Sequence, residues 1–178
     1  MPANTCVKRA LNSIENYPSK ILNVTYNGNP ITLKQYIPRS EAQTSPSLSL
    51  STPTPAPATS TTYLLIMLDL DAPFPSLPHL GPFLHWIQPG YTANPTGLLT
   101  TTSPFIANYI GPAPPPGSAP HRYSFYVFEQ PADFDAGKYA PAAGKPLSLW
   151  YRMRFDLDGW QKMAGLGEPV AVNYFLSN

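Results

Sequence analysis

The sequence predicts a mostly β domain of antiparallel strands with short helices at its periphery, and three observations support this fold class. The apolar run at residues 63–68 is too short for a helix and is typical of a strand buried on both faces. Other apolar stretches are equally short and end at breaker residues. The 24 prolines and 11 glycines leave little room for helix.

The first third of the chain is expected to hold one short helix and three short strands. Residues 7–16 could form one or two helical turns, which Tyr17 and Pro18 would end. Asn27 and Gly28 are a strong turn signal between two strands. The strands are expected at residues 21–26, 31–36 and 47–50.

The rest of the chain is expected to supply the main sheet and one helix. Strands are expected at residues 63–71, 83–88, 122–128 and 169–175. The Pro-Gly pair at 89–90 should turn the chain, and residues 111–117 should form an extended loop. The clearest helix is 156–165, with Asp156 as N-cap and Gly165 as C-cap.

One shift in composition interrupts this pattern. Ser, Thr, Pro and Ala dominate from residue 40, and residues 51–62 cannot bury enough apolar surface to order themselves. Because a core strand follows at once, we interpret this segment as a surface loop within a single domain that comprises residues 1–178.

Charge, cysteine content and hydropathy exclude several classes of protein. Charged residues make up 12% of the chain and no basic run is present, so neither a nucleic-acid groove nor an anionic membrane surface is expected. Cys6 is the single cysteine, which excludes an internal disulfide. No stretch has the length of a transmembrane segment, and residues 1–16 lack the apolar core of a secretory signal. We therefore expect a cytoplasmic protein.

Two aspartates directly follow the buried strand. Side chains two apart on a strand share a face, so Asp69 and Asp71 are expected to leave the sheet side by side. Two carboxylates about 7 Å apart repel by roughly 2 kcal/mol at an effective dielectric near 20, so a donor, a cation or a shared proton is expected nearby. Alternatively, the two could cap a turn before Pro73.

Two histidines are candidates for the same site. By strand alternation His85 shares a face with Phe83 and Ile87, so it is either a pocket residue or a core histidine bonded to a backbone carbonyl. His121 opens a strand after the proline-rich loop, where rigid loops present side chains to clefts. It could equally be a solvent-exposed strand start.

These residues belong to an ordered set of motifs that resembles the phosphatidylethanolamine-binding protein family. The motifs are Asp-Leu-Asp-Ala-Pro at 69–73, His-Trp at 85–86, Gly-Pro-Ala-Pro-Pro at 111–115 and His-Arg-Tyr at 121–123. The end of the chain, 166–175, also resembles the family's last helix and strand. The likeness covers roughly residues 20 to 176. It implies a large central β-sheet, a second smaller sheet and short peripheral helices.

The resemblance also implies a pocket for phosphate-like anions and small polar head groups. By position, the ligand-binding residues would be Asp69, Asp71, His85, Pro112, His121 and Tyr123. Imidazole and phenol donors can hold an anion, while carboxylates orient the histidines. We expect direct anion contact from His85 and backbone amides, with an orienting role for at least one aspartate. The aspartates and histidines could ligate a metal by type, but no metal or other cofactor is predicted, because the resemblance implies an anion.

The sequence departs from the family pattern around this pocket. Leu70 stands where a proline is usual, and residues 71–85 are apolar and contain no Lys or Arg. These changes favour a small organic acid or polyketide-like ligand over a charged lipid. His79 lies in this segment and could reach the pocket mouth.

Two classes of function stay open. The first is a binding protein for a small anionic or polar organic ligand that serves a fungal natural-product pathway. An inhibitor of a protease or kinase, as the resemblance implies, belongs to the same class. The second is an enzyme or enzyme accessory with a biosynthetic partner. Fungal proteins that resemble the family occur in pathways that join maleic anhydride units into maleidrides, and an Asp-His pair could act as general acid or base. No nucleophile elbow, phosphate-cradling glycine loop or dinucleotide fingerprint is present.

Overall fold

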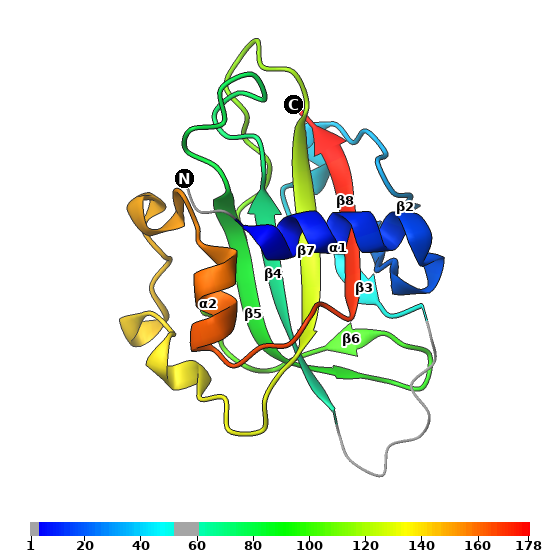
Figure 1. Cartoon of the computed structure of the whole chain (residues 1–178), viewed down its shortest axis with the longest axis vertical. Coiled ribbons are helices and arrows are strands. Elements are labelled where there is room, and N and C mark those ends of the chain that lie inside the picture. The colour runs from blue at the N-terminus through cyan, green and yellow to red at the C-terminus, as the bar shows by residue number, and fades with distance from the viewer. Residues whose placement is uncertain (1–3, 52–60) are drawn as a thin grey trace.

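Two antiparallel sheets form the framework of the protein (Figure 1). The computed structural model describes residues 4–51 and 61–178, so the expected surface loop at 51–62 lies almost entirely outside the described residues. The large sheet has the order β6-β5-β4-β7-β8 and the small sheet the order β2-β1-β3. The predicted mostly β fold, with a large and a smaller sheet, is confirmed.

The elements have the following bounds. The large sheet contains β4 (Thr62–Asp69), β5 (Phe83–Ala93), β6 (Leu99–Thr100), β7 (His121–Glu129) and β8 (Ala171–Ser177). The small sheet contains β1 (Asn23–Tyr26), β2 (Asn29–Ile31) and β3 (Ser47–Ser49). The α-helices are α1 (Thr5–Asn16) and α2 (Leu157–Met163). Short 3₁₀ turns are η1 (Pro18–Lys20), η2 (Arg39–Ala42), η3 (Ala136–Lys138), η4 (Ala142–Gly144) and η5 (Leu149–Arg152).

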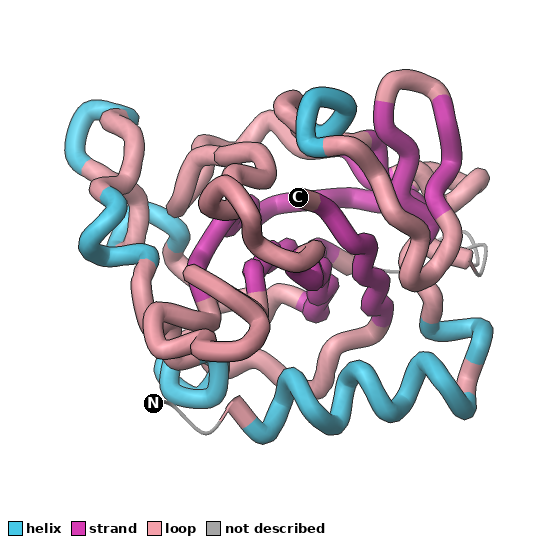
Figure 2. The backbone as a smooth tube through the Cα atoms, turned by 90° about the horizontal axis from the view of Figure 1, so that it is seen from above, coloured by secondary structure: helices cyan, strands magenta, loops and turns pink. Residues whose placement is uncertain are grey.

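The central strand β4 is buried on both faces, as its apolar run predicts. Leu65 and Met67 pack in the cluster that also contains the small sheet, whereas Leu64 and Ile66 pack in the cluster with α1. Figure 2 shows the curled large sheet between α1 on one side and the β1–β2 hairpin on the other. Each fully buried aliphatic side chain contributes about 1.5–3 kcal/mol, so β4 contributes strongly to core stability.

The strand β5 contains two bulges that strand alternation did not predict. The Pro-Gly pair at 89–90 was predicted to turn the chain, and this prediction is wrong. The pair forms a bulge opposite β4 within the continuous strand β5. The second bulge is at His85, because Met67 pairs with Trp86 while the next residue, Leu68, pairs with Leu84. His85 therefore does not share a face with Ile87, which packs in the α1 cluster.

Two further boundaries differ from the prediction. The strand expected at residues 31–36 is instead the earlier and shorter β2, Asn29–Ile31. A turn follows it, and Tyr36 makes only an isolated bridge to Leu176. The helix expected at 7–16 is longer and starts at Thr5.

The start of α1 is stabilised from another part of the chain. Its own N-cap, Asn4, makes no capping bond, but Asp158 of α2 accepts hydrogen bonds from the Thr5 and Cys6 amides at 2.7 and 2.8 Å. Burial opposes ionisation of Asp158, but the hydrogen bonds from Cys6 and Thr5 outweigh it and lower its pKa. The helix α2 has the predicted N-cap Asp156, which accepts from the Gly159 amide.

None of the helices in the described part of the chain has the length and hydropathy needed to cross a membrane.

Candidate ligand-binding site

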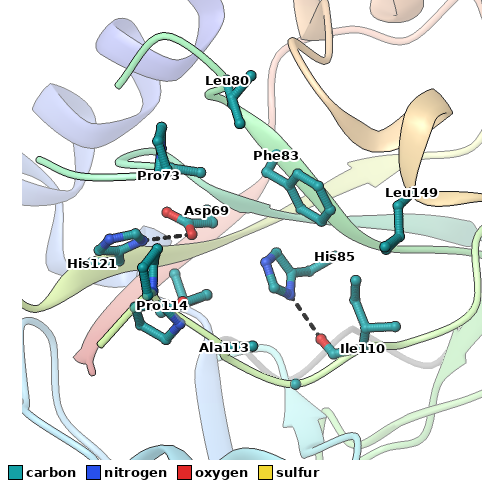
Figure 3. A pocket seen from close by; sticks show the side chains of 14 residues that line it. Asp69, Pro73, Leu80, Phe83, His85, Ile110, Ala113, Pro114, His121 and Leu149 are labelled. Carbon is teal, nitrogen blue, oxygen red and sulfur yellow. Dashed lines mark hydrogen bonds and ion pairs between the residues drawn. The ribbon is translucent and has the colours of Figure 1, made fainter. Parts of the chain in front are cut away.

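A cavity of about 290 Å³ lies where three neighbouring strands of the large sheet meet (Figure 3). β4 ends there at Asp69, which pairs with Phe83 of β5 and Tyr123 of β7. Ten of the fourteen residues that line the cavity are apolar or glycine: Ala72, Pro73, Leu80, Phe83, Ile110, Gly111, Ala113, Pro114, Pro115 and Leu149. The polar ones are Asp69, His85, His121 and Tyr123. The cavity is therefore an apolar hollow with one small polar region.

Asp69 and His121 form a buried pair in this polar region. Asp69 Oδ2 lies 2.8 Å from His121 Nδ1, and Asp69 Oδ1 accepts from the Asp71 amide at 2.8 Å. A carboxylate only accepts, so His121 carries a proton on Nδ1. Its other nitrogen, Nε2, lies 2.9 Å from Ser118 Oγ. Ser118 does not line the cavity, so this chain of hydrogen bonds fixes the ring of His121 and does not present a serine nucleophile.

His85 offers a hydrogen-bond acceptor to the cavity. Its Nδ1 lies 2.8 Å from the Ile110 carbonyl oxygen, which can only accept, so the proton is on Nδ1. Burial lowers the pKa of His85, because the charged ring loses its hydration, and this outweighs the opposing charge of Asp69. The ring is thus neutral near pH 7, and Nε2, which points away from Ile110, carries a lone pair (Figure 3).

Tyr123 contributes a buried phenol. Its ring stacks on Phe175 at 5.3 Å and meets His85 edge-on at 5.1 Å. Its hydroxyl lies near the Ala113 amide and Asp69 but makes no hydrogen bond of acceptable geometry with the described residues. Burial, together with the Asp69 charge, raises the pKa of Tyr123, so the phenol keeps its proton.

Three other candidate residues lie outside this cavity. Asp71 is beyond the end of β4, and its carboxylate accepts from the Arg122 amide, Nε and Nη2 at 2.7–2.9 Å. The two aspartates are therefore not side by side in one pocket, and the repulsion expected between them is offset by separate partners. Pro112 lines a neighbouring hollow with Arg39. His79 is exposed and does not line the cavity.

Several lining residues carried no signal in the sequence. Leu149 belongs to η5 and Ile110 to an irregular segment, and only the folded chain places them beside His85. Within residues 4–51 and 61–178, no group of three or more His, Cys, Asp or Glu side chains is arranged to hold a metal ion.

Comparisons with known proteins identify relatives of this chain. Phomoidride biosynthesis cluster protein N of Talaromyces stipitatus is 41% identical over 103 residues, which are 54% of this chain and 50% of that protein. The carboxypeptidase Y inhibitor of Saccharomyces cerevisiae is 36% identical over 76 residues, or 43% of this chain and 34% of the inhibitor. The matches thus span half or less of the length of these curated relatives.

Solved structures extend the similarity to nearly the whole chain. The carboxypeptidase Y inhibitor in complex with its cognate proteinase superposes with a TM-score of 0.74 at 25% identity, covering 97% of this chain and 93% of that chain. A phosphatidylethanolamine-binding protein from Plasmodium vivax has the same fold, with a TM-score of 0.65 at 18% identity over 97% of this chain and 95% of its own. The family model for phosphatidylethanolamine-binding protein matches residues 23–175, and the chain therefore belongs to the phosphatidylethanolamine-binding protein family.

Proposed function

We propose that the chain binds a small anionic or polar organic ligand, most simply an organic acid with an apolar body, and serves a fungal natural-product pathway. The observation that carries this proposal is the composition of the cavity: ten apolar or glycine residues surround Asp69, His85, His121 and Tyr123. Such a site buries a ligand's apolar part and orients its polar end. The similarity to a phomoidride biosynthesis cluster protein supports the link to a pathway.

The polar residues have different parts in this proposal. Asp69 orients His121 through the 2.8 Å contact, and both side chains are already bonded to the protein. His85 Nε2 supplies an acceptor that faces the cavity. The Tyr123 hydroxyl is buried and makes no hydrogen bond of acceptable geometry among the described residues, and we assign it the donor role. The apolar wall around them favours a ligand with a hydrocarbon body over a fully hydrated inorganic anion.

The test is calorimetry with hexanoate and its uncharged analogue hexanamide. His85→Ala should weaken whichever of the two binds by at least tenfold, because the ring lines the cavity and packs against the ligand. For hexanamide the variant also removes the Nε2 acceptor of the amide N–H. His79→Ala is the matched control, since this exposed histidine lies outside the cavity and its loss should change nothing. Wild-type protein that binds neither compound, or His85→Ala that binds as wild type does, would refute the proposal.

Binding and catalysis are separated by a second measurement. A pathway extract or a purified biosynthetic enzyme is incubated with its anhydride-type intermediate, with and without this chain. Additional coupled or cyclised product would assign it an enzymatic or accessory role, in which the Asp69–His121 pair could transfer a proton. Equal product in both samples would restrict the chain to binding.

A second candidate function is inhibition of a carboxypeptidase or another proteinase. It is favoured by the superposition on the carboxypeptidase Y inhibitor over 97% of this chain. Hydrolysis of a peptide substrate by carboxypeptidase Y with increasing amounts of this chain tests it directly. An unchanged rate at micromolar chain would remove this candidate.

A further inference from the structure

A guanidinium is buried directly behind the cavity. Arg152, the last residue of η5, is 1% exposed. Its Nη1 donates to the carbonyl oxygens of Leu84 and His85 at 3.2 Å, and its Nε donates to that of Leu147 at 3.1 Å. It also donates to the side-chain oxygen of Asn108 through Nη2 at 2.6 Å.

All of these acceptors are uncharged. Among the described residues no carboxylate lies within ion-pair distance of Arg152, whereas the buried Asp69 and Asp71 are paired with His121 and Arg122. Burial lowers the pKa of Arg152, but a guanidinium stays protonated in proteins. The charge is therefore held in the interior by oriented carbonyl dipoles and is not neutralised by an acid.

The position of this charge matters for a ligand. Arg152 bonds to the backbone of His85, and its own turn η5 places Leu149 in the cavity wall. The carboxylate of Asp69 also lines the cavity, and alone it would disfavour an anion there. Among the buried residues that the structure describes, no lysine and no arginine other than Arg152 is present.

We propose that Arg152 is a specificity-determining residue that acts through its charge: it offsets Asp69 and makes the cavity prefer an organic anion over an uncharged ligand of the same shape. The inference rests on the proposed function. Arg152 does not touch the ligand, because it lies behind the backbone of β5 and does not line the cavity. A unit charge about 10 Å from a bound anion changes its affinity roughly tenfold at an effective dielectric near 20.

Asn108→Asp tests this directly, because it places a carboxylate against the Arg152 guanidinium, at the cost of the hydrogen bond from Asn108 Nδ2 to the Tyr109 carbonyl oxygen. The substitution replaces the amide oxygen that already accepts from Nη2 by a carboxylate oxygen, and the Leu147 amide keeps its acceptor. The affinities for hexanoate and hexanamide are measured by calorimetry at pH 7.5. The ratio of the hexanoate affinity to the hexanamide affinity should fall roughly tenfold in Asn108→Asp, mostly through weaker hexanoate binding.

Two variants of Arg152 itself complete the test. Arg152→Lys keeps the charge and should keep the ratio, even if both affinities decline because the hydrogen-bond fork is lost. Arg152→Gln removes the charge and should lower the ratio as Asn108→Asp does. If it does not fold, the Asn108→Asp and Arg152→Lys results decide the question.

The outcomes are distinguishable. A ratio in Asn108→Asp equal to that of wild type, with both ligands weakened alike or not at all, would overturn the inference. It would mean that Arg152 is only structural or that the acid enters as its neutral form. Wild-type protein that binds neither hexanoate nor hexanamide would instead overturn the proposed function, and the inference with it.

Discussion

Acidification should destabilise the protein through His85. The ring is buried, and its loss of hydration lowers its pKa below the ordinary value of 6.5. Between that value and the lowered pKa, the unfolded chain binds a proton that the folded chain does not. The free energy of unfolding is therefore highest above about pH 6.5 and falls as the pH falls through this range.

The size of the effect follows from the linkage of one proton. Below pH 6.5 the free energy of unfolding should fall by up to about 1.4 kcal/mol for each pH unit, until the pH reaches the lowered pKa of His85. His85→Asn removes the titrating ring, and its amide can still donate to the Ile110 carbonyl. The variant should lack this part of the pH dependence.

Urea unfolding followed by tryptophan fluorescence between pH 5 and 8 measures this difference. Subtracting the variant from wild type at each pH cancels the contributions of all other groups that titrate equally in both. His79→Asn, at an exposed histidine outside the cavity, is the matched control variant. Parallel curves for wild type and His85→Asn would refute the reasoning, since they would mean that the folded protein protonates His85 as easily as the unfolded chain does.

Three further predictions concern stability. Asp71→Asn should lower the free energy of unfolding, measured in urea, by about 1–3 kcal/mol, because it weakens the hydrogen bonds from Arg122. The hexanoate affinity, measured by calorimetry, should stay within twofold of wild type. A larger loss would mean that Asp71 acts at the cavity. Asp158→Asn should lower the free energy of unfolding by about 0.5–2 kcal/mol at pH 7, because it weakens the hydrogen bonds at the start of α1. Because the pKa of Asp158 is lowered, the difference from wild type should vanish only well below pH 4. A difference that persists in strong acid would contradict this origin. Gly97→Ala should lower the melting temperature more than Gly28→Ala, since both have positive φ but a Cβ at residue 97 would lie 2.5 Å from a backbone carbonyl oxygen; equal losses would show that the loop yields.

The sequence alone determined the features that depend on local pattern. The apolar run of β4 identified a strand buried on both faces, and Asp156 identified the start of α2. The predicted C-cap, Gly165, was one residue off, because Ala164 is the C-cap and Gly165 follows it with a positive φ. The ordered motifs identified the family before any coordinates. Hydrophobic period and capping chemistry act over a few residues, so they can be read from neighbouring letters.

The candidate site was only partly accessible to this reasoning. Asp69, His85, His121 and Tyr123 were named from the motifs, and the structure brings these four around one cavity, while their binding role stays a prediction. Asp71 was assigned to the same pocket by strand alternation and by the resemblance to the family. The strand ends at Asp69, so that geometric rule no longer applies beyond it.

Only the tertiary structure decided which way His85 faces and what lies behind it. A one-residue bulge in β5 changes the face of every side chain beyond it, and nothing in the local alternation marks the bulge. Arg152 follows His85 by 67 residues, and the approach of η5 to β5 brings its charge to the cavity. Contacts of this kind depend on strand register and on the path of distant loops, which are set by the packing of the whole chain.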